Sequence, residues 1–294
     1  MSNKGQPWVS SVVRKTRLQI AQDPSLNYEY MPVMGMKSFI QASLKLLFGS
    51  HNQVIVENRV GGVHTVGDNG AFQLGAQFLK IWRQDSQVVY IISSRKEPHG
   101  LVFQDMGFKV SEYSFWDPKK LRVDPNVLLN VVESLSKTFG IYDEGVGILV
   151  VVALNNQLLL CVLSQLMTLT RALWLNSPSR GARIITSILC NPALQGEWKH
   201  SLKGLVEDIM LTKEKVKEKL RLLGTPGSWD HITDQSGPHS YLGLNSEQVE
   251  YLVKEKHIYI PKDSQINFTC INACNIDYIT QSINEAVLSI KGSQ

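Results

Sequence analysis

The sequence predicts an α/β protein, in which a mainly parallel sheet is flanked by helices and a smaller C-terminal α/β domain follows. Its 294 residues are enough for one large and one small domain. Short apolar runs alternate with segments of helical apolar spacing, the order typical of strands covered on both faces. We place the boundary near Leu205, so that the large domain covers residues 1–204 and the small domain covers residues 205–294.

Apolar periodicity and turn residues place the elements of the first half. Apolar residues at helical spacing predict helices, and short apolar runs bounded by glycine or polar residues predict strands. The pair Gly61-Gly62 is expected to end the first strand. The expected order is helices over 7–20 and 36–47, a strand over 54–60, a helix over 72–82, a strand over 88–92, a crossover helix over 99–106, a strand over 110–115 and a helix over 127–132.

The second half begins with an apolar run that predicts a strand and continues mainly as helices. Within the helix expected over 201–223, we assign Lys213, Glu214, Lys217 and Glu218 to a solvated face, because they pair at i,i+3 and i,i+4 spacing. The expected elements are a strand over 147–153, helices over 157–174, 183–189, 201–223 and 246–256, strands over 258–261 and 265–269, and a last helix over 275–290.

Composition argues against several classes of function. The net charge of +4 is spread over both signs, so no basic tract suggests nucleic-acid binding. The N-terminus has no apolar export signal, and the longest apolar run, residues 147–154, is too short to span a membrane. The four cysteines lack Cys-x-x-Cys or metal-ligand spacing, which predicts no metal site and reduced thiols in the cytoplasm.

Two segments carry candidate chemistry. In Ser134–Gly140 a lysine, Lys137, stands between hydroxyl residues; its amine can condense with an aldehyde cofactor, and Ser134 and Ser136 can hold a phosphate. In residues 63–71 a glycine turn enters a helix, where backbone N–H groups such as those of Asn69 and Gly70 can bind a phosphate. Taken alone, Lys137 is better interpreted as a surface lysine at a helix end.

A series of matches in the same order along nearly the whole chain identifies a family. The sequence resembles the class I, fold type I aminotransferases that use pyridoxal phosphate, and among them the aspartate aminotransferases. The matching segments are residues 27–32 (NYEYMP), 59–63 (RVGGV), the Lys137 motif with Gly147, Asn176 with 181–183 (GAR), 225–229 (TPGSW), 231–235 (HITDQ), 248–253 (QVEYLV) and 256–259 (KHIY).

This resemblance implies a homodimeric transaminase that moves an amino group from L-aspartate to 2-oxoglutarate. By its match, Lys137 is the lysine that forms the internal aldimine and moves the proton between Cα and C4′ of the cofactor. Ser134 and Ser136 match phosphate-binding hydroxyls, and Tyr30 matches a tyrosine that reaches the phosphate of the neighbouring subunit. Arg171 matches the arginine that crosses the dimer interface to the side-chain carboxylate of the substrate.

Other interpretations of three of these positions remain open on the residues alone. Tyr30 would be a packed aromatic residue, and Arg171 an arginine on the surface of a helix. His99 matches a histidine beneath the cofactor ring, but its usual aspartate partner is not found, and a neutral surface histidine is an equal alternative.

The departures from the family pattern all fall at the expected site. The arginine that clamps the cofactor phosphate is replaced by Gly145, and the arginine for the α-carboxylate by Gln265. The phosphate-loop glycine-threonine pair becomes Asp68-Asn69, which puts a negative charge where an anion should bind. The tryptophan that stacks on the pyridine ring falls on Lys96. We therefore expect weak binding of pyridoxal phosphate.

The resemblance also implies a missing internal segment, because Glu133 joins Val132 directly to Ser134, and a missing N-terminal arm. The segment supplies central strands and the aspartate that keeps the pyridine nitrogen protonated. Its loss leads us to expect a marginally stable fold. Two hypotheses follow: an aspartate aminotransferase with a degenerate site, or a non-catalytic relative that acts as a dimerising binding or regulatory partner.

Overall fold

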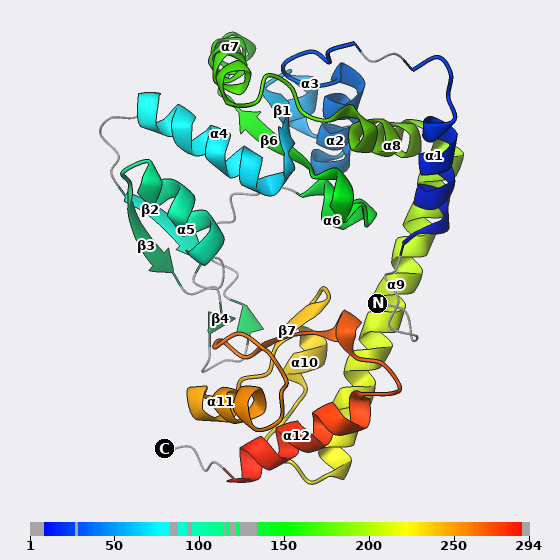
Figure 1. Ribbon diagram of the computed structural model, residues 1–294, viewed down its shortest axis with the longest axis vertical. Coiled ribbons are helices and arrows are strands. Elements are labelled where there is room, and N and C mark those ends of the chain that lie inside the picture. The colour runs from blue at the N-terminus through cyan, green and yellow to red at the C-terminus, as the bar shows by residue number, and fades with distance from the viewer. Residues whose placement is uncertain are drawn as a thin grey trace. The chain divides into compact units, whose positions relative to one another are not determined.

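The computed structural model describes residues 9–26, 29–82, 88–92, 96–113, 116–117, 122–123 and 134–289. Their contacts divide into two compact units, which are considered separately (Figure 1). The first unit comprises residues 9–113 and 134–200 within the described ranges, and it holds the lysine motif. The second comprises residues 201–289 together with two two-residue strands, β4 (Trp116–Asp117) and β5 (Arg122–Val123).

The first unit contains α1 (Ser11–Ala21), α2 (Lys37–Phe48), α3 (Gln53–Val56), β1 (Val60–Val66), α4 (Gly67–Trp82), β2 (Val88–Ile92), α5 (Lys96–Asp105), β3 (Lys109–Tyr113), α6 (Leu135–Phe139), the 3₁₀ turn η2 (Tyr142–Glu144), β6 (Val146–Val152), α7 (Asn156–Leu173) and α8 (Ser179–Cys190). The helix α9 (Pro192–Leu222) begins in this unit and ends in the second. The second unit adds α10 (His231–Asp234), β7 (His239–Tyr241), α11 (Ser246–Lys254), β8 (Gln265–Asn267), η3 (Phe268–Cys270) and α12 (Ile276–Ser289).

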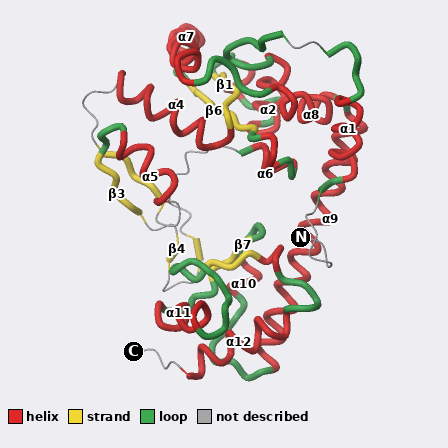
Figure 2. The backbone as a smooth tube through the Cα atoms, viewed as in Figure 1, coloured by secondary structure: helices red, strands yellow, loops and turns green. Residues whose placement is uncertain are grey.

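The described strands form four short pairs, and helices make up most of the described chain (Figure 2). β1 and β6 run antiparallel, with Val60 opposite Val152 and Val66 opposite Val146. β2 and β3 are parallel, whereas β4–β5 and β7–β8 are antiparallel. The prediction of a mainly parallel sheet is therefore wrong for the described residues. Parallel strands need a crossover connection, and α5 supplies it between β2 and β3. β7 and β8 also have one helix, α11, between them, yet they pair antiparallel.

The predicted strand over 54–60 is wrong, because the chain forms the short helix α3 there. The side chain of Asn52 accepts a hydrogen bond from the Val54 N–H at 3.1 Å and starts that helix. Gly61 and Gly62 do not end a strand; they lie inside β1. A Cβ on Gly62 would come within 2.9 Å of Ile148 Cδ1, so glycine permits β1 and β6 to pack closely here.

The other predicted elements compare as follows. The described helices and strands overlap the predictions over 36–47, 72–82, 88–92, 99–106, 147–153, 157–174, 183–189, 246–256 and 275–290. The strand predicted over 258–261 is wrong, and that segment has no regular structure. β7 was not predicted, and it forms because Ser240 pairs with Ile266 of β8. The helix predicted over 127–132 lies outside the described residues.

Each unit has its own core. In the first, β1 packs against α4 and α7, and Val63, Leu74 and Leu166 are buried together. In the second, apolar residues of α9, α11 and α12 surround Phe268 and Leu252. Within the described part of the chain, no helix has both the length and the apolar character needed to cross a bilayer.

Lys213 corrects the assignment of the charged residues of α9. Its side chain is fully buried in the second unit, not solvated. Its Nζ donates to the Gln235 carbonyl oxygen at 2.6 Å and lies 5.4 Å from the centre of the Phe268 ring. Burial lowers the pKa of the Lys213 ammonium. Lys217, one turn further on, is partly exposed and pairs with Glu214 at 2.8 Å, as predicted.

Candidate active site around Lys137

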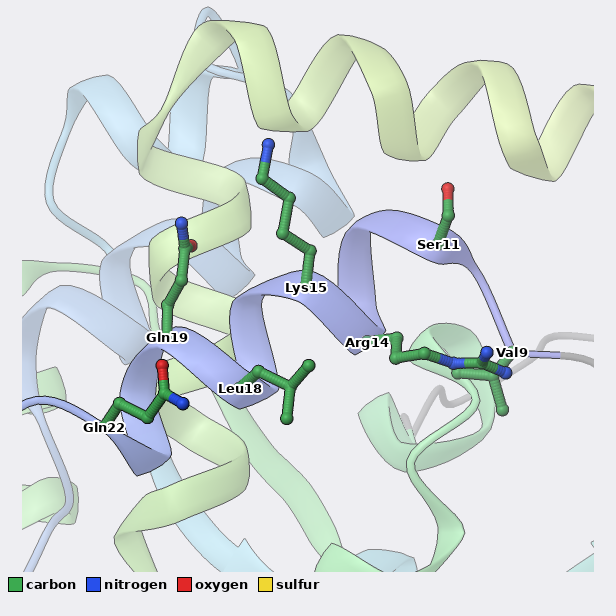
Figure 3. A pocket seen from close by; sticks show the side chains of 7 residues that line it. All are labelled: Val9, Ser11, Arg14, Lys15, Leu18, Gln19 and Gln22. Atoms are coloured by element: carbon green, nitrogen blue, oxygen red, sulfur yellow. The ribbon is translucent and has the colours of Figure 1, made fainter.

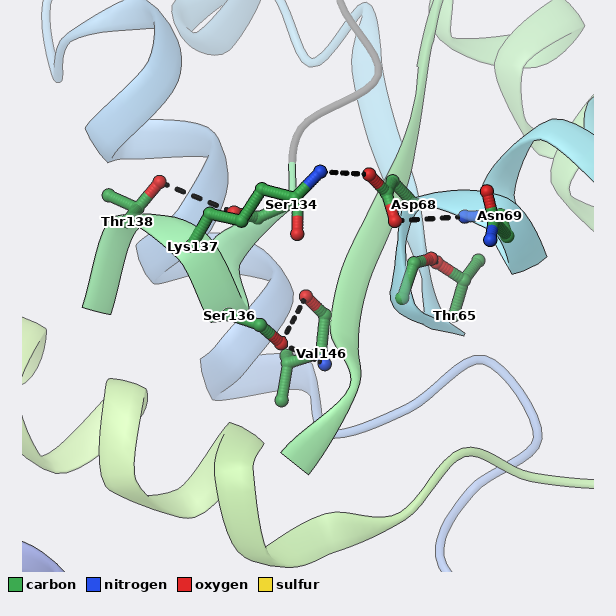
Figure 4. A network of polar contacts seen from close by, with 9 residues as sticks. Thr65, Asp68, Asn69, Ser134, Ser136, Lys137, Thr138 and Val146 are labelled. Carbon is green, nitrogen blue, oxygen red and sulfur yellow. Dashed lines mark hydrogen bonds and ion pairs between the residues drawn. The ribbon is translucent and has the colours of Figure 1, made fainter. Parts of the chain in front are cut away.

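Lys137 lies in the last turn of α6 and reaches toward the start of α4. Gly140, with φ of 68°, ends α6 in a left-handed conformation. The Lys137 Nζ donates to Asp68 Oδ2 at 2.7 Å, and Figure 4 shows the two side chains pointing at each other from the two helices. The lysine side chain is 58% exposed and that of Asp68 is 21% exposed, so this is a partly solvated ion pair.

Backbone contacts fix the first turn of α4 against β6. The Gly67 N–H donates to the Gly145 carbonyl at 2.6 Å, and Thr65 Oγ1 donates to the Gly67 carbonyl at 2.8 Å. A Cβ on Gly147 would stand 2.2 Å from the Gly67 oxygen, so only glycine fits at position 147. Asp68 is therefore carried on a backbone whose position does not depend on its own side chain.

The Asp68 carboxylate is the anion of this cluster. Burial raises its pKa, but the hydrogen bond and the charge of Lys137, together with the backbone N–H groups of Asp68 and Asn69, outweigh burial and leave the pKa lowered. The Asn69 N–H donates to Asp68 Oδ1 at 3.1 Å. The first turn of α4 therefore has a carboxylate of its own on the N–H groups that could otherwise bind a phosphate.

The two serines of the motif lie in different environments. Ser136 is buried, and its Oγ accepts from the Val146 N–H at 2.5 Å and donates to the Val146 carbonyl at 3.3 Å. Ser134 precedes α6 without a side-chain capping bond, and its carbonyl accepts from Thr138 Oγ1 at 3.4 Å. Ser136 thus joins α6 to β6 (Figure 4), while the Ser134 side chain is partly exposed.

We expect Ser136→Ala to lower the free energy of unfolding by about 1–3 kcal/mol, because it removes the side-chain acceptor of a buried N–H group. Ser134→Ala, the matched control two residues away, should change it by less than about 0.5 kcal/mol. Urea unfolding of both variants measures the difference. Equal losses would contradict a structural role for the Ser136 hydroxyl.

The remaining predicted site residues lie apart from this cluster or beside it. Gly70 follows Asn69 in α4, where an added Cβ would be in ordinary contact with Trp174 Cη2 at 3.7 Å. Tyr30 is 80% exposed in the segment before α2, so it is not a packed aromatic residue. Arg171 is exposed in the last turn of α7. Within the described residues, neither Tyr30 nor Arg171 makes a hydrogen bond or ion pair with Lys137 or Asp68.

The positions that depart from the family pattern are also defined. Gly145 has φ of 56°, and open space surrounds the place of its missing side chain. Gln265 begins β8 in the second unit, where its N–H donates to Asp263 Oδ1 at 3.1 Å. Lys96 begins α5, but its side chain is outside the described set. His99 is buried and stacks on Phe72 at 3.7 Å between ring centres, which corrects the surface alternative.

Sequence reasoning missed two features of this region. Asp68 was identified as a misplaced charge, but not as the partner of Lys137, because 69 residues separate them in the chain. His64 was not singled out. It is buried in β1, its ring lies 4.6 Å from that of Phe39, and its Nε2 has no hydrogen-bond partner within the described residues. The available signal in the sequence was its place in the largely apolar run Val60–Val66.

A hollow of about 460 Å³ runs along α1 and is formed by side chains of that helix, of Val9 just before it and of Gln22 just after it (Figure 3). A second, of about 340 Å³, lies between α1 and residues 140–143. Lys137 and Asp68 line neither of these two hollows. Among the described residues, no group of three acidic, histidine or cysteine side chains is placed to hold a metal ion.

A family model identifies the class of protein to which this chain belongs. The family model described as "Aminotransferase class I and II" matches residues 86–283. The chain belongs to this family.

Similarity to individual relatives supports the same family assignment. The chain is 62% identical to "Putative aspartate aminotransferase, cytoplasmic 2" of Bos taurus, over all of this chain and 90% of that protein. It is 33% identical to "Aspartate aminotransferase, cytoplasmic" of Gallus gallus, over 99% of this chain and 90% of that protein. The solved aspartate aminotransferase from Saccharomyces cerevisiae cytoplasm has the same fold, with a TM-score of 0.89, 23% identity and coverage of 98% of this chain and 90% of that chain.

The bovine alignment also bears on the internal segment. It spans 366 positions, 72 more than the 294 residues of this chain, so that relative carries residues without a counterpart here.

A solved aromatic-amino-acid aminotransferase from Burkholderia pseudomallei, of TM-score 0.88 and 23% identity, is described as covalently bound to pyridoxal phosphate.

The residues around Lys137 do not fit the phosphate of that cofactor. The carboxylate of Asp68 lies beside the lysine, the Asn69 N–H already binds that carboxylate, and the Ser136 hydroxyl is engaged by Val146. A phosphate monoester carries about −1.5 to −2 charges at pH 7 and would be repelled by the carboxylate.

Proposed function

We propose that this chain is an aspartate aminotransferase-like protein that has lost transamination and acts as a dimerising binding or regulatory partner. The ion pair between Lys137 and Asp68 carries this proposal. The Lys137 nitrogen donates a hydrogen bond to this carboxylate, so it is less free to attack an aldehyde carbon, and the carboxylate repels a phosphorylated aldehyde. The proposed site of action is the cytoplasm, the compartment named for the bovine and chicken relatives.

Two substitutions support the same proposal. By the resemblance, Gly145 takes the place of the arginine that clamps the cofactor phosphate, and this position offers no side chain at all. Gln265 takes the place of the arginine for the α-carboxylate, and an amide offers a hydrogen bond without the opposite charge. Both changes remove charge-assisted contacts, each of which contributes about 1.5–3 kcal/mol.

The alternative is an active homodimer that transfers the amino group of L-aspartate to 2-oxoglutarate with weakly bound pyridoxal phosphate. The exposure of Lys137 favours it, because more than half of the side chain is accessible to a ligand. Arg171 is also exposed, as an arginine that reaches into a partner subunit would be. In this alternative, Tyr30 would serve the phosphate of the partner subunit.

Visible absorption of the purified full chain mixed with pyridoxal phosphate separates the two. We expect no absorption band that depends on Lys137, so wild type and Lys137→Ala should give the same spectrum. Lys203→Ala is the matched control, because Lys203 is an exposed lysine paired with Glu207 at 3.8 Å and far from the motif in sequence. A band that is absent only in Lys137→Ala and loses intensity when L-aspartate is added would overturn the proposal.

A further inference from the structure

The charges of the Lys137 cluster cancel without any ligand. The Lys137 Nζ lies 2.7 Å from Asp68 Oδ2, within the described residues no other charged side chain makes an ion pair with either of them, and the pair is accessible to solvent on the lysine side. A neutral aldehyde that approaches the amine meets a site of balanced charge. A phosphorylated aldehyde brings about two further negative charges to within a few ångströms of the carboxylate.

The first turn of α4 does not compensate for this repulsion. A helix N-terminus attracts anions through its free N–H groups, but here Asp68 Oδ1 already accepts from the Asn69 N–H at 3.1 Å. The backbone cannot withdraw the carboxylate, because Gly67 is bonded to Gly145 and lies against Gly147. Only rotation of the Asp68 side chain, which breaks the ion pair, would clear the position.

We infer that Asp68 is the specificity-determining residue of this site. Its carboxylate occupies the position that a ligand phosphate would take, so the Lys137 amine reacts preferentially with unphosphorylated aldehydes. This inference deepens the proposed loss of transamination. Its test compares two aldehydes and does not depend on turnover, so the two proposals can fail separately.

The experiment traps each aldehyde on the full chain with borohydride. The neutral Lys137 amine adds to the aldehyde carbon, water leaves, and hydride from borohydride reduces the C=N bond to a stable secondary amine. Pyridoxal and pyridoxal 5′-phosphate are the two probes, used at low ionic strength because a partly exposed pair is screened by salt. Mass spectrometry of the peptide that contains Lys137 measures the modified fraction.

We expect Asp68→Asn to raise trapping of pyridoxal phosphate about tenfold and to change trapping of pyridoxal less than about twofold. Asp68→Glu keeps the charge and should behave as wild type. Asp143→Asn is the matched control, because it removes a carboxylate that pairs with Arg17 elsewhere in the same unit. Circular dichroism of each variant verifies that it is folded.

Two results would overturn the inference. An equal rise for both aldehydes in Asp68→Asn would mean that Asp68 only restrains the amine and does not discriminate by charge. An unchanged ratio of the two products would mean that the carboxylate has no effect on the choice. If wild type transaminates L-aspartate and Asp68→Asn still shifts the ratio tenfold, the proposed function fails and this inference stands.

Discussion

Replacing Lys213 with alanine is expected to lower the free energy of unfolding by about 3–5 kcal/mol. The fully buried four-carbon stem fills space in the second core, and the ammonium group is the donor to the Gln235 carbonyl. Truncation leaves a cavity and a carbonyl without this partner. Urea unfolding followed by the fluorescence of Trp229, which is buried in the same core, measures the loss.

Lys217→Ala is the matched control for Lys213, since it is one turn away on α9. Lys217 is partly exposed and forms a surface pair with Glu214, so its loss should cost less than about 1 kcal/mol. Similar losses for the two variants would show that Lys213 is solvated after all.

Acidification is expected to destabilise the first unit through His64 by about 3 kcal/mol. Burial lowers the pKa of His64 from 6.5 to about 4, so the folded protein keeps the ring neutral where the unfolded chain protonates it. Above pH 6.5 both states are neutral and the contribution is fully present. Between pH 6.5 and 4 the unfolded state binds the proton first, and stability falls.

Urea unfolding at pH 7.5 and 4.5, for wild type and His64→Phe, isolates this effect from the titration of carboxylates. The variant keeps a ring against Phe39 but cannot titrate, so its loss on acidification should be smaller than that of wild type by about 2.5 kcal/mol. His51→Phe, at an exposed position, should lose as much as wild type. If wild type and His64→Phe lose equally, the ring is protonated in the folded protein.

Local pattern was enough to place most elements, because helices such as α2 and α7 display their apolar spacing in a single segment. It failed for strand pairing. Whether β1 lies parallel or antiparallel to its neighbour depends on how the chain returns, and β6 returns more than 80 residues later. The error at 54–60 is of another kind, because β-branched residues there favoured a strand, while the Asn52 cap started a helix.

The candidate site likewise has a part that the sequence could predict and a part that it could not. The lysine and its serines are neighbours in sequence, so the motif could be found without a structure. The engagement of Ser136 by Val146 and of Lys137 by Asp68 could not, since both need residues that come together only in the fold. Lys213 could have been found: it is four residues after Ile209 and three before Val216, on the apolar face of α9, and was set aside only because it is charged.

At this site, main-chain contacts of Gly67, Gly145 and Gly147 fix the shape of the backbone, whereas the side chain at position 68 sets the charge. The hydrogen bond of Gly67 and the close approach at Gly147 involve main-chain atoms, so neither changes when the side chain at position 68 changes. Position 147 admits no side chain, whereas position 68 can carry a negative, neutral or positive group on the same backbone. One half-buried position can therefore reverse the ligand preference of the protein while its fold remains the same.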